Sequence, residues 1–328
     1  MRLASLRDGG RDGTLIVVDR AMSTGVRVDG IAPTLEQALE NWAAVGPKLQ
    51  SVYDELNAGR VEGSFPLEVG DLASPLPRSH QFLDGSVYLH HMEKARKARG
   101  ADMPPNHKTD PVMYQGLSDS FVGPRDPMPI VDTTLNADYE AEIAVVLDDV
   151  PAGVSANDAA GHIALVVLLN DYTFRALTKT ELPKGFGFLQ AKPTSSFGPV
   201  AVTPDELGDV WDGEKFHLEV RSHVNDTLMG NPNAGEGMFF TYPQLIAHAA
   251  RTRPLSAGTI IGAGSISNQD ESRGHGCIAE ARIAEQIATG TEHTPWLQYG
   301  DVVAIEAFDK SGESVFGRIE QVIAPTGG

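Results

Sequence analysis

At residues 138–147 the chain reads Asp138-Tyr139-Glu140-Ala141-Glu142-Ile143-Ala144-Val145-Val146-Leu147, an acidic start followed by an aliphatic run. The composition of the run predicts a β-strand that enters a hydrophobic core. Side chains alternate across a strand, so Glu140 and Glu142 share one face and their apolar neighbours share the other. Two carboxylates on a core-directed face repel each other and are costly to desolvate, which favours a hard divalent cation between them. A solvated edge strand with two surface glutamates is the alternative that this segment leaves open.

The composition is that of a globular protein rich in turns. With 328 residues the chain is long enough for two domains, or for one large and one small domain. Its 34 glycines and 21 prolines are more than a helical bundle would tolerate, so they favour a β or α+β architecture. We therefore expect an α+β fold with a predominantly β C-terminal domain and a small α/β N-terminal domain.

Charge and cysteine content limit the partners and the compartment. The formal net charge of −18 argues against nucleic acid or an anionic membrane as a partner, because both require a basic face. Cys277 is the one cysteine of the chain, which excludes an internal disulfide and favours a reducing cytoplasm. The start of the sequence shows no apolar signal-peptide region, and the longest aliphatic run, 163–169, is too short to span a bilayer. We expect a cytoplasmic protein that acts on a small molecule.

The N-terminal part of the chain has the pattern of a small separate unit. Strands are predicted at 1–5, 14–18 and 22–28, followed by helices at 34–42 and 46–56. Thr34 is placed to cap the first helix, with Gln37 completing a capping box. The segment 63–77 is rich in proline and glycine and is the predicted connection. We therefore expect a small N-terminal domain at 1–72 and a catalytic domain at 73–328.

The remainder of the chain is predicted to be mostly β-structure. Strands are expected at 143–147, 164–169, 197–202, 216–224, 259–261, 302–308 and 314–323, with helices at 90–99, from 155 and at 242–251. The segment from Pro104 to Pro129 shows little periodicity, so it is expected to be a long loop that is functional or mobile.

Acidic residues stand at the ends of several predicted elements, namely Asp84, Glu140, Glu142 and Asp171. Asp171 follows a predicted apolar strand, where a carboxylate is harder to explain as a solvent-exposed surface residue. Each residue taken alone is equally well a turn residue or a helix cap. Taken together, they make an all-oxygen site for a divalent cation, with room for water or substrate.

Three motifs occur in order along the chain: Asp84-Gly85-Ser86-Val87-Tyr88-Leu89-His90-His91, Asp138-Tyr139-Glu140-Ala141-Glu142 and Asn170-Asp171-Tyr172. They resemble the metal-site motifs of the fumarylacetoacetate hydrolase family. The run from Arg96 to Pro104 is similar to that of bacterial members with a short N-terminal domain. The resemblance covers roughly residues 75–325 and implies the mixed β-roll of that family for the C-terminal domain.

The resemblance implies a role for each matching residue. The matching metal ligands, for Mg²⁺ or Ca²⁺ with Mn²⁺ as a further option, are Asp84, Glu140, Glu142 and Asp171. The matching catalytic residues are the general base His91, its orienting carboxylate Glu280 and the charge-stabilising Lys192. The matching substrate contacts are Tyr114, Ser265 and Arg175, and the family more often has threonine in place of Ser265. Members are commonly homodimers, so the resemblance implies a homodimer here.

These roles agree with hydrolysis of a C–C bond in a β-diketo acid. We expect fumarylacetoacetate or a related acylpyruvate as the substrate, in the catabolism of tyrosine or another aromatic compound. A metal-dependent 2-oxo acid decarboxylase, hydratase or isomerase on the same site is the alternative within enzymes. A metal-stabilised binding module without turnover is the alternative from another class. The fumarylacetoacetate enzymes proper have glutamine and tyrosine where this chain has Thr178 and Leu182, so the substrate stays open.

Several side chains also have plainer interpretations. His90 and His91 are neighbours that the sequence alone cannot rank, and Glu280 alternates with Ile278 and Arg282 as on a solvent-facing strand. Cys277 near His275 could be a thiol nucleophile, but no orienting group is evident. A further motif, Gly262-Ala263-Gly264, is only half of a dinucleotide-binding fingerprint.

Overall fold

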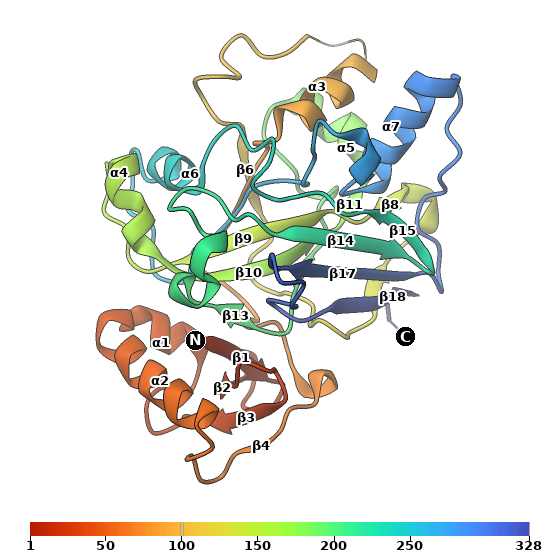
Figure 1. The fold of residues 1–328 in the computed structure, drawn as a ribbon. Helices are drawn as coiled ribbons and strands as arrows, with labels where there is room; N and C mark the ends of the chain where they lie inside the picture. Colours follow the sequence, from red (N-terminus) through yellow and green to blue (C-terminus); the bar gives the residue numbers. More distant parts are fainter. Residues whose placement is uncertain (99, 101, 328) are drawn as a thin grey trace.

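The structure is a computed structural model that describes residues 1–98, 100 and 102–327 (Figure 1). It has the mixed α+β architecture that the composition predicts, with a small N-terminal unit against a larger and mostly β body. Arg99 and Ala101, in the run compared with bacterial family members, lie outside the described residues.

The described strands form three sheets. The largest has the order β4 (Phe65–Pro66), β3 (Thr24–Arg27), β2 (Thr14–Val18), β1 (Arg2–Leu6), β13 (Ala201–Val202), β10 (Ile163–Asp171), β9 (Ala141–Leu147), β16 (Ile260–Gly262), β5 (Phe82–Gly85) and β6 (Met113–Gly116), with β12 (Ser195–Phe197) also paired to β10. A second sheet has the order β15 (Thr227–Gly230), β14 (Glu219–Val224), β17 (Val302–Phe308), β18 (Ile319–Pro325) and β7 (Met128–Ile130). The third pairs β8 (Ala137–Asp138) with β11 (Thr173–Phe174).

Helices lie around these sheets (Figure 1). They are α1 (Leu35–Glu40), α2 (Trp42–Asn57), α3 (Leu89–Ala98), α4 (Ala156–Ala159), α5 (Arg175–Glu181), α6 (Tyr242–Ala249) and α7 (Ile278–Thr289). Short 3₁₀ turns are η1 (Val69–Asp71), η2 (Thr133–Leu135), η3 (Ala160–His162), η4 (Leu182–Lys184), η5 (Pro204–Val210) and η6 (Glu271–Arg273). The expected cap at Thr34 is confirmed, because its side chain accepts a hydrogen bond from the Gln37 N–H at 3.2 Å. No helix of the described chain is both long and apolar enough to cross a membrane.

Strand β9 lies between two hydrophobic clusters. Ile143, Val145 and Leu147 belong to one cluster, whereas Ala144 and Val146 belong to the other. Both faces of the strand are therefore buried, and the solvated edge strand considered for this segment is wrong. The pairing of β9 with β10 on one side and β16 on the other explains why, since a central strand has no edge in solvent.

Other local predictions need correction. The stretch from Pro104 to Pro129 contains β6 and the start of β7, because both short segments pair with distant strands that a local pattern does not reveal. The strand predicted at 197–202 is interrupted between Phe197 and Ala201 by a Gly-Pro pair. Glu280 lies in helix α7, so its assignment to a strand was wrong; three alternating residues are too short a window to exclude a helix.

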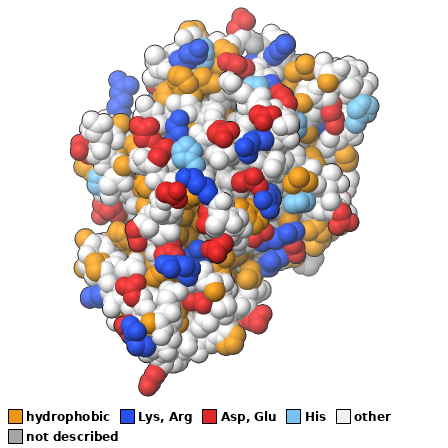
Figure 2. All heavy atoms as spheres, in the orientation of Figure 1, with side chains coloured by type: hydrophobic (Ala, Val, Ile, Leu, Met, Phe, Trp, Pro, Cys, Tyr) orange, Lys and Arg blue, Asp and Glu red, His pale blue; other side chains and the backbone are white. Residues whose placement is uncertain are grey.

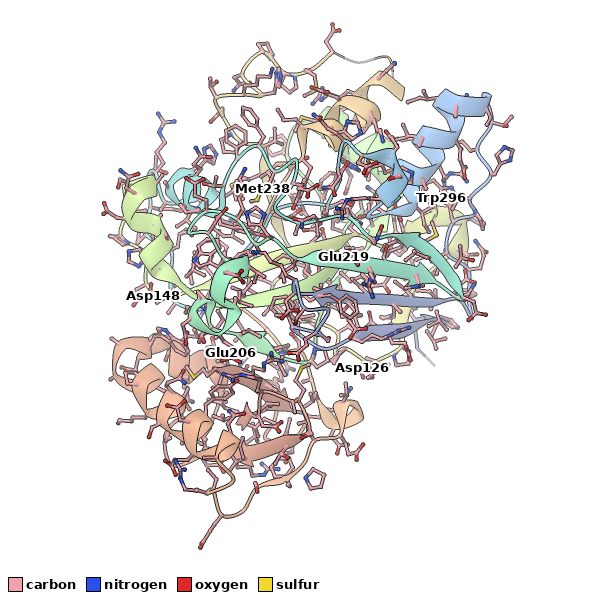
Figure 3. The ribbon with its side chains drawn as sticks, viewed as in Figure 1. Asp126, Asp148, Glu206, Glu219, Met238 and Trp296 are labelled. Atoms are coloured by element: carbon pink, nitrogen blue, oxygen red, sulfur yellow. The ribbon has the colours of Figure 1, made fainter. Side chains whose placement is uncertain are left out.

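The surface drawn in Figure 2 carries acidic and basic side chains interspersed with one another. Where the small N-terminal unit meets the body, Figure 3 labels Glu206 of η5. Its carboxylate accepts hydrogen bonds from Tyr53 Oη at 2.6 Å and from Arg20 Nε at 2.8 Å. These contacts join α2 and the loop after β2 to the larger body.

Candidate active site

Three buried carboxylates converge at one end of the large sheet. Asp84 lies on β5, Glu142 near the start of β9, and Asp171 at the end of β10. Antiparallel pairing of β9 with β10 brings the last two together, and β16 joins β9 to β5. One oxygen from each carboxylate lies within 4.8 Å of the others. The order of the strands in the sheet therefore brings together Asp84 and Asp171, which lie almost ninety positions apart in the sequence.

Gly262 of β16 makes this convergence possible. A Cβ atom at this position would collide with Asp84 Oδ1 and would lie 3.2 Å from Glu142 Oε2. The Gly264 N–H then donates hydrogen bonds to Asp84 Oδ1 at 3.0 Å and to Glu142 Oε2 at 3.1 Å. The motif Gly262-Ala263-Gly264 thus shapes a carboxylate cradle.

The electrostatics of the cradle favour a cation. Burial, and then the charge of Asp171, raise the pKa of Asp84 well above its ordinary value; burial and Asp84 do the same for Glu142. Among the described residues, Glu142 Oε1 is buried and has no hydrogen-bond partner. A hard divalent cation would satisfy that oxygen and relieve the repulsion, so the donor set fits Mg²⁺, Ca²⁺ or Mn²⁺.

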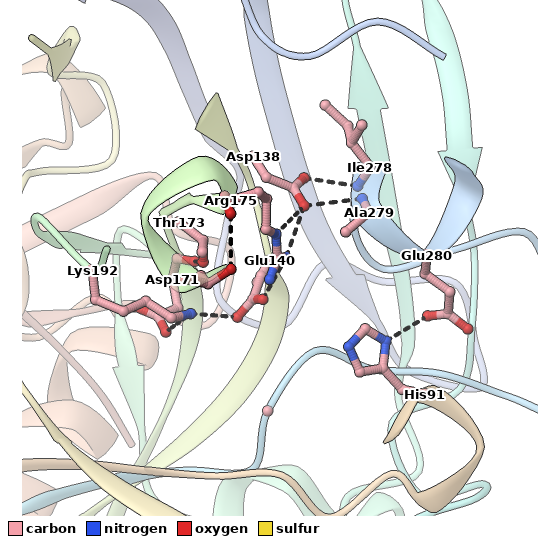
Figure 4. A network of polar contacts seen from close by, with 12 residues as sticks. His91, Asp138, Glu140, Asp171, Thr173, Arg175, Lys192, Ile278, Ala279 and Glu280 are labelled. Carbon is pink, nitrogen blue, oxygen red and sulfur yellow. Dashed lines mark hydrogen bonds and ion pairs between the residues drawn. The ribbon is translucent and has the colours of Figure 1, made fainter. Parts of the chain in front are cut away.

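Glu140, the fourth acidic residue, faces two cations. Its carboxylate accepts hydrogen bonds from Lys192 Nζ at 2.7 Å and from Arg175 Nη2 at 2.6 Å (Figure 4). Lys192 Nζ also donates to Asp171 Oδ2 at 2.5 Å, so the lysine links Glu140 to the carboxylate cluster. Burial would raise the pKa of Glu140, but Lys192 and then Arg175 outweigh it and lower the pKa to about 2. Glu140 therefore stays ionised beside the cradle, and its oxygens are not part of the group within 4.8 Å.

Asp138 is a buried acidic residue that the sequence reasoning did not select as a site residue. Its carboxylate accepts hydrogen bonds from Arg175 Nε at 2.8 Å and from the N–H groups of Ile278 and Ala279 at 2.8 and 3.0 Å (Figure 4). It therefore caps the first turn of α7 and holds the arginine that binds Glu140. The sequence does contain a pattern that could have identified Asp138, because Asp138, Glu140 and Glu142 are spaced by two residues.

A histidine and a glutamate pair beside this network. His91 Nδ1 lies 3.1 Å from Glu280 Oε2 (Figure 4). The Ser267 hydroxyl donates to Glu280 Oε1 at 2.6 Å. Burial would raise the pKa of Glu280, but His275 and then His91 hold it well below its ordinary value. His90 instead lies 3.2 Å from Glu271 Oε1, so the two neighbouring histidines have different partners.

The three residues that the resemblance implies as substrate contacts differ in their hydrogen-bond partners. The Tyr114 hydroxyl donates to Asp171 Oδ2 at 2.5 Å, and burial together with Asp171 raises the Tyr114 pKa so that the proton is retained. Ser265 Oγ is buried and makes no hydrogen bond within the described part of the chain. Arg175 is occupied by its two carboxylates. Ser195, which sequence reasoning missed, donates to Asp171 Oδ1 at 2.7 Å.

The arrangement of acids, histidine and lysine can be compared with known proteins. The family model for the fumarylacetoacetate (FAA) hydrolase C-terminal domain matches residues 81–324. The chain belongs to the fumarylacetoacetate hydrolase family. A second model, for fumarylacetoacetase N-terminal domain 2, matches residues 1–78.

Relatives within this family have more than one activity. The chain is 32% identical over 205 residues to a 2,4-didehydro-3-deoxy-L-rhamnonate hydrolase of Sphingomonas sp. (strain SKA58), which covers 60% of this chain and 69% of the relative. It is 29% identical over 154 residues to the mitochondrial oxaloacetate tautomerase fahd2 of Xenopus laevis, which is 46% of each protein, so about half of that relative is spanned.

The fold is shared with solved structures. A maleylpyruvate hydrolase from Sphingobium sp. SYK-6, whose crystal structure is described as a complex with manganese(II) ion and pyruvate, superposes with a TM-score of 0.66. The match covers 99% of both chains at 16% identity. The fumarylacetoacetate hydrolase fold is thus shown over the whole chain, and the family includes both hydrolases and tautomerases.

Proposed function

We propose that this protein is a metal-dependent hydrolase that cleaves the C–C bond of a β-diketo acid. The substrate is fumarylacetoacetate or a related acylpyruvate, formed during catabolism of tyrosine or another aromatic compound. One observation supports this proposal most: His91 Nδ1 lies 3.1 Å from the buried carboxylate of Glu280, next to a cradle of acidic residues. A histidine oriented in this way is suited to activate water.

The carboxylates of Asp84, Glu142 and Asp171 would hold the cation, Mg²⁺ or Ca²⁺ with Mn²⁺ as a further option. A cation bound there would polarise the substrate carbonyl that is attacked. The structure of a maleylpyruvate hydrolase with manganese(II) and pyruvate supports the choice of both the metal and the substrate class. Glu140 would contribute fixed negative charge close to these ligands, held in place by Arg175 and Lys192.

His91 would act as the general base through Nε2. Glu280 accepts the hydrogen of Nδ1, which leaves the Nε2 lone pair free to take a proton from water. Because the pKa of Glu280 is far below its ordinary value, the carboxylate stays ionised and stabilises the imidazolium that results. The water oxygen then adds to the acyl carbon.

The C–C bond next to this carbon breaks, and its electron pair moves to the carbon of the departing acid. The Lys192 ammonium stabilises the enolate-like negative charge that develops there. The proton on His91 Nε2 is then transferred to that carbon. One water molecule is consumed and two carboxylic acids are released, so the atoms and protons balance.

A tautomerase is the second candidate function. The relative from Xenopus laevis is an oxaloacetate tautomerase, and keto–enol exchange needs only proton transfer next to a polarised carbonyl. His91 would then move a carbon-bound proton without adding water. The two functions differ in products, because a tautomerase returns the same molecule in another form.

The test compares the purified full-length protein with and without metal. Fumarylacetoacetate and simple acylpyruvates are followed by loss of diketone absorbance and by quantifying the two acids, and oxaloacetate is followed as the enol. We expect release of acids that stops after EDTA treatment and returns with Mg²⁺ or Mn²⁺. Undiminished turnover by verified metal-free protein would contradict a metal-dependent hydrolase, and enol exchange without acid release would favour the tautomerase.

Matched histidine variants test the base. His91→Ala should lose about two to four orders of magnitude in kcat, the usual contribution of a positioned general base. His90→Ala should retain most activity, because His90 faces the exposed Glu271 instead of Glu280. Equal losses in both variants would contradict the assignment of His91.

A further inference from the structure

A second set of metal-ligating side chains lies at the N-terminus of α7. His91, Cys277 and Glu280 each offer one ligand atom, and these atoms lie within 4.8 Å of one another. Cys277 is buried at the N-cap position of α7, where its side chain makes no capping hydrogen bond, and His91 reaches this point from α3. The set contains nitrogen, sulfur and oxygen, whereas the cradle formed by Asp84, Glu142 and Asp171 contains only oxygen.

The two sets differ in the cations that they prefer. A thiol, an imidazole and one carboxylate suit a borderline-soft cation such as Zn²⁺, while carboxylates alone suit Mg²⁺ or Mn²⁺. Zinc bonds of about 2.0–2.3 Å place two tetrahedral ligands roughly 3.3–3.8 Å apart. The 3.1 Å between His91 Nδ1 and Glu280 Oε2 is already near this spacing, and a ligand atom of Cys277 belongs to the same group within 4.8 Å.

His275 lies beside this set, although it is not one of the three residues whose ligand atoms lie within 4.8 Å of one another. Its Nδ1 atom is buried, makes no hydrogen bond among the described residues and lies 3.9 Å from Glu280 Oε1. A buried ring nitrogen without a partner is costly, and a metal bond would satisfy it. Neither the carboxylate cradle nor the proposed hydrolysis gives Cys277 a role.

We propose that His91, Cys277 and Glu280 form an inhibitory site for Zn²⁺ or a similar thiophilic cation, and that His275 can approach the open fourth position. Binding releases the thiol proton to solvent as the metal–sulfur bond forms, and the hydrogen shared by His91 Nδ1 and Glu280 moves through solvent to Nε2 as the metal–nitrogen bond forms. With Nδ1 bonded to the metal, the neutral imidazole carries its hydrogen on Nε2 and cannot accept a proton from water. The inhibitory consequence rests on the proposed function of His91; the metal site itself does not.

The site can be detected without measuring activity. The full-length protein is first saturated with Mg²⁺ and then titrated with Co²⁺, which gives near-ultraviolet charge-transfer absorption only when bonded to a thiolate. Because Cys277 is the one cysteine of the chain, such absorption reports this residue alone. We expect one equivalent of Co²⁺ to produce the band and Zn²⁺ to abolish it. A protein that develops no band, or a band that Zn²⁺ leaves unchanged, would overturn the proposal.

Variants link the band to inhibition. Cys277→Ser, with Cys277→Ala as the alternative should serine disturb the α7 cap, should show no band. Zn²⁺ inhibition is measured relative to each protein's own rate without zinc, and the zinc concentration for half-inhibition should rise about tenfold or more when the thiolate is lost. His275→Asn should also weaken inhibition. A band in the wild type with no zinc inhibition would support the metal site and contradict the role of His91 as base. Unchanged zinc sensitivity in both cysteine variants would overturn the inhibitory site.

Discussion

Replacement of Asp138 by asparagine should weaken the connection between α7, which carries Glu280, and Arg175, which binds Glu140. The Asp138 carboxylate accepts hydrogen bonds from Ile278 and Ala279 at the start of α7 and from Arg175. Ala279 and Arg175 share one carboxylate oxygen, so the asparagine oxygen is best placed there and its NH₂ group must face the Ile278 N–H. An unsatisfied buried N–H costs about 1–3 kcal/mol, and breaking a buried ion pair costs about 3–5 kcal/mol.

These two costs are partly offset. Burial raises the pKa of Asp138, so a neutral side chain removes a desolvation cost as well as the repulsion from Glu140. We therefore expect the free energy of unfolding to fall by about 2–4 kcal/mol, which leaves a typical domain folded. Because α7 carries Glu280, we also expect kcat to fall about tenfold to a hundredfold, as small displacements of catalytic groups do.

Urea unfolding followed by tryptophan fluorescence measures the stability, and steady-state kinetics separates kcat from KM. Asp132→Asn is the matched control, because Asp132 also accepts a hydrogen bond from a backbone N–H, that of Thr134 at 2.8 Å, but is exposed and caps only a short turn. Asp138→Glu, which keeps the charge, should recover part of kcat. A loss of stability no greater than that of Asp132→Asn, together with unchanged kcat, would refute the reasoning.

Three further substitutions probe the charges of the structure. Glu142→Gln should abolish the rise in melting temperature that Mg²⁺ causes. The melting temperature of the metal-free protein should stay equal or increase, because burial and Asp84 raise the pKa of Glu142 and so disfavour its charged form. Thermal melts with and without Mg²⁺ measure both effects. Lys192→Met should lower the melting temperature and kcat, because Glu140 and Asp171 lose the cation that they share. Breaking a buried ion pair costs about 3–5 kcal/mol of unfolding free energy. Lys184→Met, on an exposed turn, is the control. Glu206→Gln should lower the melting temperature at pH 7 but have little effect at a pH below the folded pKa of Glu206. Burial raises the Glu206 pKa, but Arg20 and Tyr53 outweigh it and lower the pKa. The contribution of the ionised carboxylate is therefore present above the unfolded pKa of about 4.3 and is lost as pH falls through the folded pKa. Equal effects of Glu206→Gln at both pH values would contradict the ionised network.

Strong local patterns made much of the β-structure predictable. The strand β17, at Val302–Phe308, has the predicted bounds, and the aliphatic run before Asn170 forms β10 as expected. In both cases the residues are β-branched or aliphatic over a length typical of strands. The element that carries Glu280 was misassigned because its first residues also fit an alternating pattern, and the helical period becomes visible only over the full length of α7.

The candidate site was only partly predictable for a different reason. The spacing of Glu140 and Glu142 does identify a buried pair of acids, but it does not identify their partners. Glu142 faces Asp84 and Asp171 across the sheet, whereas Glu140 is paired with Arg175 and Lys192. Those cations lie 35 and 52 residues further along the chain, so only the tertiary fold decides which acid receives them. The family resemblance supplied residue identities, and the structure shows that the two glutamates have different partners.

The proposed boundary between residues 1–72 and 73–328 divides a continuous sheet. Strand β1 pairs with β13, with Leu3 opposite Ala201, and one hydrophobic cluster contains Leu3 together with Leu165 and Leu169 of β10. Removing residues 1–72 would expose this apolar surface and leave β13 as an unpaired edge.

We therefore expect the fragment 73–328 to aggregate or to bind a hydrophobic dye, in contrast to the full-length protein, in light scattering and fluorescence assays. Adding the separate 1–72 fragment should restore solubility, because it supplies β1 and its apolar face. A soluble, cooperatively melting and active 73–328 fragment would show that the catalytic unit folds alone. In that case the shared sheet would be a docking contact between two independent domains, and the cluster around Leu3 would contribute little to the stability of the site.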